Sequence, residues 1–226
     1  MLSFDILTVL PESLDSYINT AIVKRAIDKK KIKIQIHNLR DWSDNNYKSV
    51  DDHPYGGGAG MVMRLDIIFK ALKKLKALEL KKKDKTKVIL FAANGAPLTQ
   101  RKLEEWSKLN RLVLICGRYE GIDNRVAEHL ADEVISIGPY VLTGGEIPAL
   151  TVIDGVTRLL SDVIKKESLQ EESFSNGSEK GEYPQYTRPE KFYPDIKKKK
   201  KHWDVPEVLL TGDHKKIEEW RKNVES

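Results

Sequence analysis

Short apolar runs alternate with longer helical patterns along most of this chain. Five runs have the length and residue types of strands, at residues 3–10, 32–37, 88–92, 112–116 and 134–137. Apolar residues recur at helical spacing at residues 12–30, 65–80, 99–109, 122–130 and 147–164. A helix between two successive strands lets the two strands lie parallel in one sheet. The pattern therefore predicts an α/β fold, with a mostly parallel sheet and helices on both faces. Residues 41–60 form a polar, glycine-rich loop that is too long to be an incidental connection.

Two glycine-rich stretches follow the last two apolar runs, at residues 115–123 and 137–149. Glycine lets main-chain amide and carbonyl groups approach a ligand that a side chain would keep away. A tight turn explains any single glycine of this kind. Their concentration in two neighbouring loops favours a small-molecule pocket.

The common nucleotide-binding motifs do not fit this pocket. The glycines at residues 56–60 do not have the dinucleotide spacing, and the chain has no Gly-Lys pair for a P-loop. The lone cysteine, Cys116, excludes a disulfide framework and a cysteine-based zinc site. Because Cys116 lies within an apolar run, we expect a core residue and not a nucleophile.

Composition indicates a soluble globular protein, with 40% hydrophobic and 32% charged residues. No apolar run is long enough to cross a membrane, and residues 1–5 lack the basic and apolar regions of a signal peptide. We therefore expect a cytoplasmic protein with no membrane contact.

The net charge of +5 suggests an anionic partner, and the lysines are clustered. One cluster covers residues 81–87, and a second covers residues 197–201, beside Phe192, Tyr193, His202 and Trp203. A lysine run is usually a solvated face. A run flanked by aromatic residues is a better candidate for contacts with a phosphate backbone.

Periodicity is lost between residues 165 and 202. This stretch is rich in Glu, Ser, Gly, Pro and Lys, which is typical of a mobile linker, and residues 186–189 resemble an extended docking segment. An apolar run at 208–210 and a helical pattern at 213–223 follow. The expected organisation is a main domain at 1–164, a flexible linker at 165–202 and a small C-terminal module at 203–226.

The predicted helix at residues 147–164 is apolar on two sides. One stripe contains Leu150, Ile153 and Leu160, and the other contains Val152, Val156, Leu159 and Val163. Packing onto one sheet requires a single stripe. The pattern therefore implies a second partner surface.

Four motifs occur in the order found in one family of enzymes, at residues 50–61, 116–123, 137–149 and 186–190. Over residues 5–220 the chain resembles the bacterial TrmD family, the tRNA (guanine-N1)-methyltransferases of the SPOUT class. The resemblance implies a homodimer in which each subunit ties a deep trefoil knot, with a small C-terminal module that binds tRNA. It also implies transfer of a methyl group from S-adenosylmethionine to N1 of the guanosine immediately 3′ of the anticodon.

The resemblance places the cofactor in the two glycine-rich loops, with the end of an earlier strand as its floor. The residues assigned to the cofactor are Phe91, Ala92, Ala93, Asn94, Gly117, Tyr119, Glu120, Gly121, Ile137, Gly138, Pro139, Tyr140, Val141, Leu142, Gly144, Gly145 and Pro148. Main-chain groups in such loops can recognise an adenine, and the glycines leave room for the methionine part to bend.

Methyl transfer to guanine N1 needs two further groups. N1 carries a proton at neutral pH, so a general base must take it, and negative charge develops on the neighbouring O6. A carboxylate and an arginine meet these needs, and the resemblance assigns the roles to Glu172 and Arg158. Contacts with the target RNA are assigned to Asp51, Tyr55, Gly58, Ala59, Gly60, Arg158 and Arg188.

The chain departs from the family pattern at three places. Glu172 stands where the family usually has aspartate. Ala59 stands where the family commonly has proline, which is expected to loosen the loop beside the target base. The family's C-terminal module usually continues beyond Ser226, so we expect fewer contacts with the tRNA arms, for which the lysine runs can compensate.

The family also depends on magnesium, although no metal-ligand spacing is visible in this sequence. The carboxylates of Asp51, Asp52, Glu171 and Glu172 are equally consistent with solvated side chains.

Two alternatives to this function are open. One is a SPOUT methyltransferase with another RNA target, and the segments at 51–61 and 186–190 argue against it. The other is a non-catalytic RNA-binding relative, which would lack Arg158 or the acidic group, and both are present.

Overall fold

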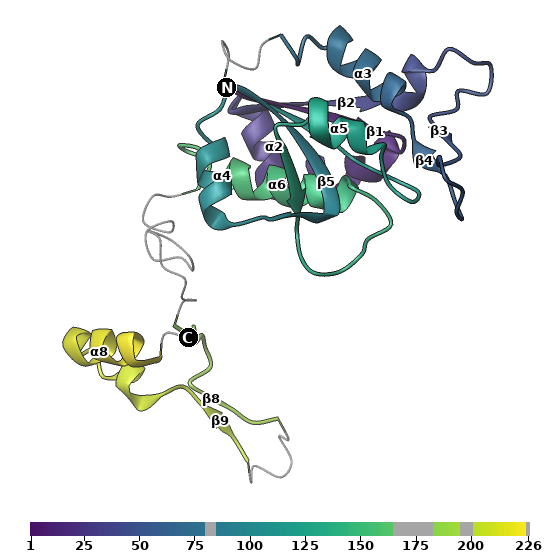
Figure 1. The fold of residues 1–226 in the computed structure, drawn as a ribbon. Helices are drawn as coiled ribbons and strands as arrows, with labels where there is room; N and C mark the ends of the chain where they lie inside the picture. Colours follow the sequence, from purple (N-terminus) through teal and green to yellow (C-terminus); the bar gives the residue numbers. More distant parts are fainter. Residues whose placement is uncertain (80–84, 165–182, 195–200, 225–226) are drawn as a thin grey trace. The chain divides into compact units, whose positions relative to one another are not determined.

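The computed structural model describes residues 1–79, 85–164, 183–194 and 201–224. Contacts divide the chain into two compact units, Met1–Lys166 and Glu167–Ser226. The first unit holds a sheet with its helices, and the second holds a short hairpin and a helix (Figure 1). Much of the predicted linker, including Glu171 and Glu172, lies outside the described residues.

Five strands form the sheet of the first unit, in the order β2-β1-β6-β5-β7, and all of their pairings are parallel. The strands are β1 (Leu2–Thr8), β2 (Ile32–Asn38), β5 (Thr86–Pro97), β6 (Arg111–Ile115) and β7 (Glu133–Ser136). In this register Phe4 of β1 lies between Ile34 of β2 and Leu112 of β6. The predicted α/β fold with a parallel sheet is confirmed.

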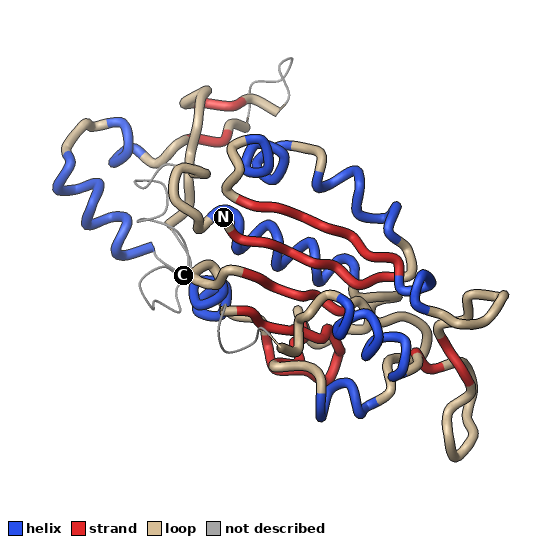
Figure 2. Tube along the Cα trace, turned by 90° about the horizontal axis from the view of Figure 1, so that it is seen from above, coloured by secondary structure: helices blue, strands red, loops and turns tan. Residues whose placement is uncertain are grey.

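Figure 2 shows the strands side by side, and helices cover both faces of the sheet. On one face the core contains residues of α2 (Ala21–Asp28), α4 (Gln100–Trp106) and α6 (Glu146–Arg158). On the other face it contains residues of α3 (Leu65–Lys74) and α5 (Asn124–His129). Since side chains alternate along a strand, the same strands supply both cores.

The predicted helix at residues 12–30 is wrong as one continuous element. The structure has a 3-10 turn, η1 (Pro11–Leu14), a single helical turn, α1 (Asp15–Ile18), and then α2. The side-chain amide of Asn19 donates a hydrogen bond of 2.8 Å to the carbonyl of Asp15, and Ala21 has a φ of 48°. Such local bonds compete with the helical hydrogen bonds, so the helix restarts at Ala21.

The helix α3 ends at Lys74, ahead of its predicted end at residue 80. Lys76 adopts a left-handed φ of 55°. The amide of Ala77 then donates to the carbonyl of Leu72 at 2.9 Å, which makes a Schellman motif. Glycine is the usual residue at this position, so a lysine there gives no sequence signal for the helix end.

The predicted loop at residues 41–60 contains a short strand. This strand, β3 (Asp51–Asp52), pairs in antiparallel with β4 (Val62–Met63), and the neighbouring Val50 is completely buried. Both strands have only two residues. Strands this short leave no alternating pattern to recognise.

The helix α6 is buried through its middle. Val152, Ile153 and Val156 are completely buried within the first unit, whereas Ile147 keeps 60% of its surface exposed. The helix ends at Arg158, ahead of its predicted end at residue 164. Packing within the unit therefore accounts for much of the doubly apolar pattern but leaves an apolar residue exposed in the first turn.

The second unit contains a two-stranded hairpin of β8 (Lys191–Phe192) and β9 (Trp203–Asp204). A 3-10 turn, η4 (Glu207–Leu210), and α8 (His214–Val224) follow. The rings of Tyr186 and Trp220 lie 6.2 Å apart. Among the described residues of the whole chain, no helix is long and apolar enough to cross a membrane.

Asp5 is a buried charge in the centre of the sheet, with 2% of its surface exposed. Its carboxylate shares a hydrogen bond of 2.6 Å with Nε2 of His37 on β2 and accepts one of 2.7 Å from Nε of Arg111 on β6. Burial by itself raises the pKa of Asp5, but the bonds with His37 and Arg111 outweigh burial and lower this pKa below its ordinary value. The carboxylate therefore links three adjacent strands.

Asp5→Asn is expected to lower the free energy of unfolding by about 3 kcal/mol at neutral pH, because Arg111 loses its buried partner. The pKa of Asp5 is lower in the folded chain than its ordinary value of 3.8, so its charge stabilises the fold above that pH. This stabilisation is lost as the pH falls through the folded-state pKa. Denaturant unfolding of parent and variant at a series of pH values measures the difference, which should shrink in acid.

The matched control is Asp28→Asn, which breaks an exposed ion pair with Lys24 on α2. It should change the free energy of unfolding by less than about 1 kcal/mol at any pH. If the difference in free energy of unfolding between parent and Asp5→Asn stayed constant from neutral pH into acid, the stabilising role of the Asp5 charge would be contradicted.

Candidate functional site

A cavity of about 600 Å³ lies at the carboxyl ends of β6 and β7, beside β5. Ligands commonly bind at this edge of a parallel sheet. The lining residues come from four segments, 90–94, 117–122, 134–138 and 140–145, together with Asn124, Ala127 and Pro148. The two glycine-rich loops thus meet around one cavity.

The floor of the cavity comes from an irregularity in β5. Phe91 and Ala96 both pair with Ile135 of β7, so the residues between them leave the regular register. Three of these residues, Ala92, Ala93 and Asn94, line the cavity. The part of β5 that leaves the regular pairing with β7 therefore forms one wall of the cavity.

The loop after β6 is attached to the segment that leads into β4. The amide of Glu120 donates to the carbonyl of Met61 at 3.0 Å, and the amide of Met63 donates to the carbonyl of Gly121 at 2.9 Å. The side chain of Glu120 covers Gly60, where a Cβ would lie 2.3 Å from Cγ of Glu120. The structure therefore brings a residue expected at the target base against one expected at the cofactor.

The loop after β7 is held across the end of β6 by its glycines. The amide of Gly145 donates to the carbonyl of Gly117 at 2.9 Å. A Cβ at position 145 would lie 2.6 Å from Cα of Cys116, so only glycine fits there. This contact closes the wall of the cavity and leads directly into α6.

A buried carboxylate lies behind this wall. Glu146 is 4% exposed, accepts a hydrogen bond of 2.6 Å from Oγ1 of Thr8 and accepts one of 3.0 Å from Nε of Arg118. Arg118 lines the main cavity and also a second cavity of about 370 Å³, which Ile147 and Leu150 border. Thr8 therefore holds the carboxylate of Glu146, and Glu146 in turn holds the guanidinium of Arg118 between the two cavities.

Sequence reasoning assigned no role to Thr8, Arg118 or Glu146. The available signal was a charged residue inside each glycine-rich motif, at positions 118 and 146. Thr8 gave no signal, because it becomes a partner of Glu146 only through a contact between residues 138 positions apart.

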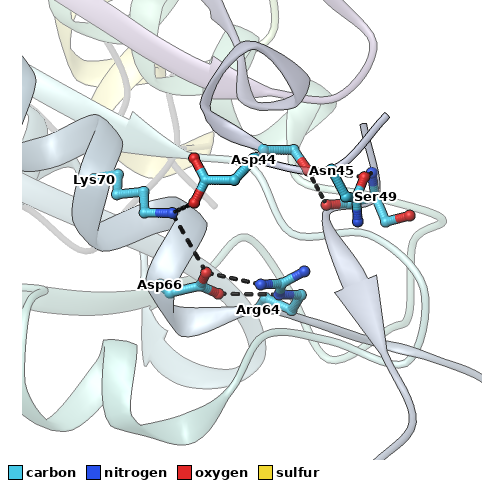
Figure 3. A network of polar contacts seen from close by, with 7 residues as sticks. Asp44, Asn45, Ser49, Arg64, Asp66 and Lys70 are labelled. Atoms are coloured by element: carbon cyan, nitrogen blue, oxygen red, sulfur yellow. Dashed lines mark hydrogen bonds and ion pairs between the residues drawn. The ribbon is translucent and has the colours of Figure 1, made fainter. Parts of the chain in front are cut away.

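A network of charges attaches the loop before β3 to α3 (Figure 3). Lys70 of α3 pairs with Asp44 of this loop and lies 3.8 Å from Asp66. Arg64 donates two hydrogen bonds to Asp66, at 2.8 and 3.0 Å. Burial raises the pKa of Asp66, but the hydrogen bonds from Arg64 together with the positive charges of Arg64 and Lys70 lower this pKa below its ordinary value. Each charged side chain of the network therefore lies beside one of opposite sign.

Comparison with known proteins decides the family. The model of the family described as tRNA (Guanine-1)-methyltransferase TrmD matches residues 2–226. The chain belongs to this family.

Three curated relatives, each named tRNA (guanine-N(1)-)-methyltransferase, show the extent of the similarity. The protein of Dictyoglomus turgidum is 46% identical over 98% of this chain and 84% of its own length. The protein of Bacillus pumilus is 44% identical over 98% of the chain and 86% of its own length. The protein of Staphylococcus haemolyticus is 43% identical over 97% of the chain and 84% of its own length.

The residues that the TrmD resemblance assigns to the cofactor lie together. All of them except Pro139 line the main cavity. Cys116 lies behind this cavity and is completely buried, and burial raises the pKa of its thiol well above the ordinary value. Cys116 is therefore a core residue, as expected.

The residues assigned to the RNA do not line this cavity, although Gly60 lies against Glu120, which does. Tyr55 and Gly58–Gly60 are exposed on the segment between β3 and β4, Asp51 lies in β3, and Arg188 is exposed in the second unit. Arg158 is the last residue of α6, and it does not line either cavity. Glu172 lies outside the described residues.

Gly145→Ala is expected to weaken binding of S-adenosylmethionine by about tenfold or more, because the added Cβ must displace the backbone at Cys116 and open the wall of the cavity. Isothermal titration calorimetry of parent and variant measures the affinity. Gly155→Ala, in the helix α6 that begins directly after Gly145, is the matched control, since its Cβ meets only the end of the Leu103 side chain. Equal affinities for Gly145→Ala and the parent would show that the wall is not needed.

Proposed function

We propose that this chain methylates N1 of the guanosine immediately 3′ of the anticodon in tRNA, with S-adenosylmethionine as the methyl donor. Membership of a tRNA (guanine-1)-methyltransferase family supports the reaction. The observation that carries the proposal is the single cavity lined by the residues assigned to the cofactor, with Pro139 as the exception.

The cavity suits a donor of this size and chemistry. Pockets for small ligands and cofactors usually measure about 300–1,000 Å³ and combine apolar walls with a few polar groups. Here the apolar side chains of Phe91, Ile135 and Leu142 contribute to the walls beside the main chain of the glycine loops. An adenine can lie between the apolar groups while loop amides and carbonyls recognise its edge.

The donor supplies an electrophilic methyl group on a sulfonium. A bond forms between guanine N1 and the methyl carbon as the carbon–sulfur bond breaks, and S-adenosylhomocysteine leaves. The carboxylate of Glu172 takes the N1 proton, and the guanidinium of Arg158 stabilises the charge that develops on O6. The step needs no oxidant or reductant, and guanine N1 is its nucleophile.

The position of Arg158 supports a site shared between two copies of the chain. Pro148 of α6 lines the cavity, and Arg158 follows ten residues later in the same helix. At 1.5 Å per residue the two residues are about 15 Å apart along the helix axis. We therefore propose that Arg158 reaches the cavity from a second subunit.

The exposed apolar side chains near α6 provide a surface for that second subunit. Val141 is 85% exposed and Ile147 is 60% exposed, and both border the second cavity. In the proposal these residues are buried between two copies, and each copy carries the trefoil knot of the SPOUT class. The enzyme acts in the cytoplasm on tRNA.

The family resemblance also implies magnesium. Among the described residues, no group of three or more His, Cys, Asp and Glu side chains is placed to hold a metal ion. No step of the proposed reaction is assigned to magnesium.

The experiment that tests the function uses labelled S-adenosylmethionine and an unmodified tRNA with guanosine 3′ of its anticodon. Digestion and nucleoside analysis should find N1-methylguanosine at that position, and a tRNA with adenosine there should remain unlabelled. A label elsewhere in the tRNA would indicate another SPOUT target. Binding of tRNA without any label would indicate a non-catalytic relative.

Glu172→Gln is expected to lower the single-turnover rate of methyl transfer by about 10²-fold or more, because only the proton acceptor is removed. Glu172→Asp should retain substantial activity, and binding of S-adenosylmethionine should not change in either variant. Glu171→Gln is the matched control. A rate for Glu172→Gln close to that of the parent would place the base elsewhere.

A further inference from the structure

The β8–β9 hairpin carries aromatic side chains that the described residues leave exposed. Trp203 is 66% exposed, Phe192 is 47% exposed and Tyr193 is 36% exposed, and His202 is also exposed. Large aromatic side chains are stabilised by burial. Because these side chains stay exposed in the folded hairpin, their presence there points to a contact with another molecule.

The rings form two pairs along the hairpin. Phe192 is paired with Trp203 in the antiparallel register, and their ring centroids lie 5.5 Å apart. The rings of Tyr193 and His202 lie 5.6 Å apart at the next position.

The two ring pairs lie on opposite faces of the hairpin, because successive side chains of a strand point to opposite faces. Nε2 of His202, just before β9, also lies 3.0 Å from Oδ2 of Asp204, two residues later, as expected for side chains on one face. A ribbon of two strands has no core layer beneath either face. Each face therefore carries one pair of rings that are partly exposed.

The charge of this segment favours an anionic partner. The hairpin sequence from Lys191 to Asp204 contains six lysines and two aspartates. Lys191 and Lys201 lie in the described part of the hairpin, and both are exposed. Exposed aromatic rings together with clustered positive charge are the two components of surfaces that bind unpaired nucleic acid.

Unpaired bases fit these rings better than a duplex does. In a duplex the face of each base is covered by its neighbours, whereas an unpaired base can stack on a Phe, Tyr, Trp or His ring. Lysines beside the rings can contact the phosphates that connect successive bases.

We propose that the β8–β9 hairpin is a stacking surface for unpaired nucleotides of the tRNA substrate. Bases stack on the pairs Phe192–Trp203 and Tyr193–His202, and the phosphates contact Lys191 and Lys201. This inference rests on the proposed function only for the identity of the RNA. The hairpin anchors the tRNA and takes no part in methyl transfer.

The first test measures tRNA affinity with the full chain. Trp203→Leu should weaken binding by about tenfold, because one stacked base loses its ring. Trp203→Tyr keeps a ring and should bind within about threefold of the parent, which also shows that the hairpin tolerates substitution. Phe69→Leu removes an exposed ring from α3, outside the hairpin, and is the control. Equal losses for the Leu and Tyr variants at position 203 would overturn stacking.

Salt separates stacking from charge. Trp203→Leu should lower affinity at every salt concentration and leave the salt dependence unchanged, because no phosphate contact is removed. Replacing Lys191 and Lys201 by glutamine should reduce the steepness of the salt dependence. A salt dependence that changes with Trp203→Leu and not with the lysine variant would contradict the assigned roles.

The second test compares two RNAs of equal length and charge, a stem with an unpaired loop and a blunt duplex. The parent should prefer the looped RNA, and Trp203→Leu should lose this preference. An equal loss of affinity for both RNAs would contradict recognition of unpaired bases. Because lysines with Trp and Tyr also occur at membrane surfaces, anionic phosphatidylserine vesicles are included, and vesicles that displace the looped RNA would overturn the proposal.

Methyl-transfer assays distinguish failure of the stacking surface from failure of the proposed function. At saturating tRNA, Trp203→Leu should have the single-turnover rate of the parent. If the parent binds the looped RNA through Trp203 and methylates no tRNA, the proposed function fails and the stacking surface stands. If the parent methylates tRNA and Trp203→Leu binds it normally, the stacking surface fails and the function stands.

Discussion

The contact between Gly145 and the end of β6 is the constraint on which the candidate site depends. The amide of Gly145 bonds the carbonyl of Gly117, and the absence of a side chain lets its backbone lie against Cys116. This contact holds the loop after β7 across the carboxyl end of the sheet. It therefore determines both the wall of the cavity and the point from which α6 begins.

The buried charge next to that contact depends on the same geometry. Glu146 follows Gly145 directly, and burial of a carboxylate is tolerated only where hydrogen bonds replace water. Thr8 and Arg118 supply these bonds. Because Arg118 borders both cavities, the position of the loop also determines where a positive charge lies between the main cavity and the surface proposed for the second subunit.

Local sequence patterns predicted most of the first unit. They failed where a side chain bonds to the backbone within a helix and where a lysine occupies a position that is usually glycine. The strands and their parallel sheet followed from apolar runs, and the cavity followed from the glycine loops. The helix at residues 12–30 was interrupted because Asn19 bonds the backbone of Asp15. The end of α3 was missed because Lys76 takes the left-handed conformation that a glycine usually marks. The role of Arg158 stays a prediction, as does that of Glu172.

The sequence by itself determined the α/β class, the approximate strands and helices, and the loops able to form a ligand pocket. These properties follow from residue spacing and from the conformations that single residues allow. Only the tertiary structure decided that Gly60 lies against Glu120, that Thr8 bonds Glu146 and that Phe192 pairs with Trp203. The first two contacts join residues distant in the chain, and the third depends on the register of a hairpin. Tertiary packing and strand register determine these partners, and local residue spacing does not predict them.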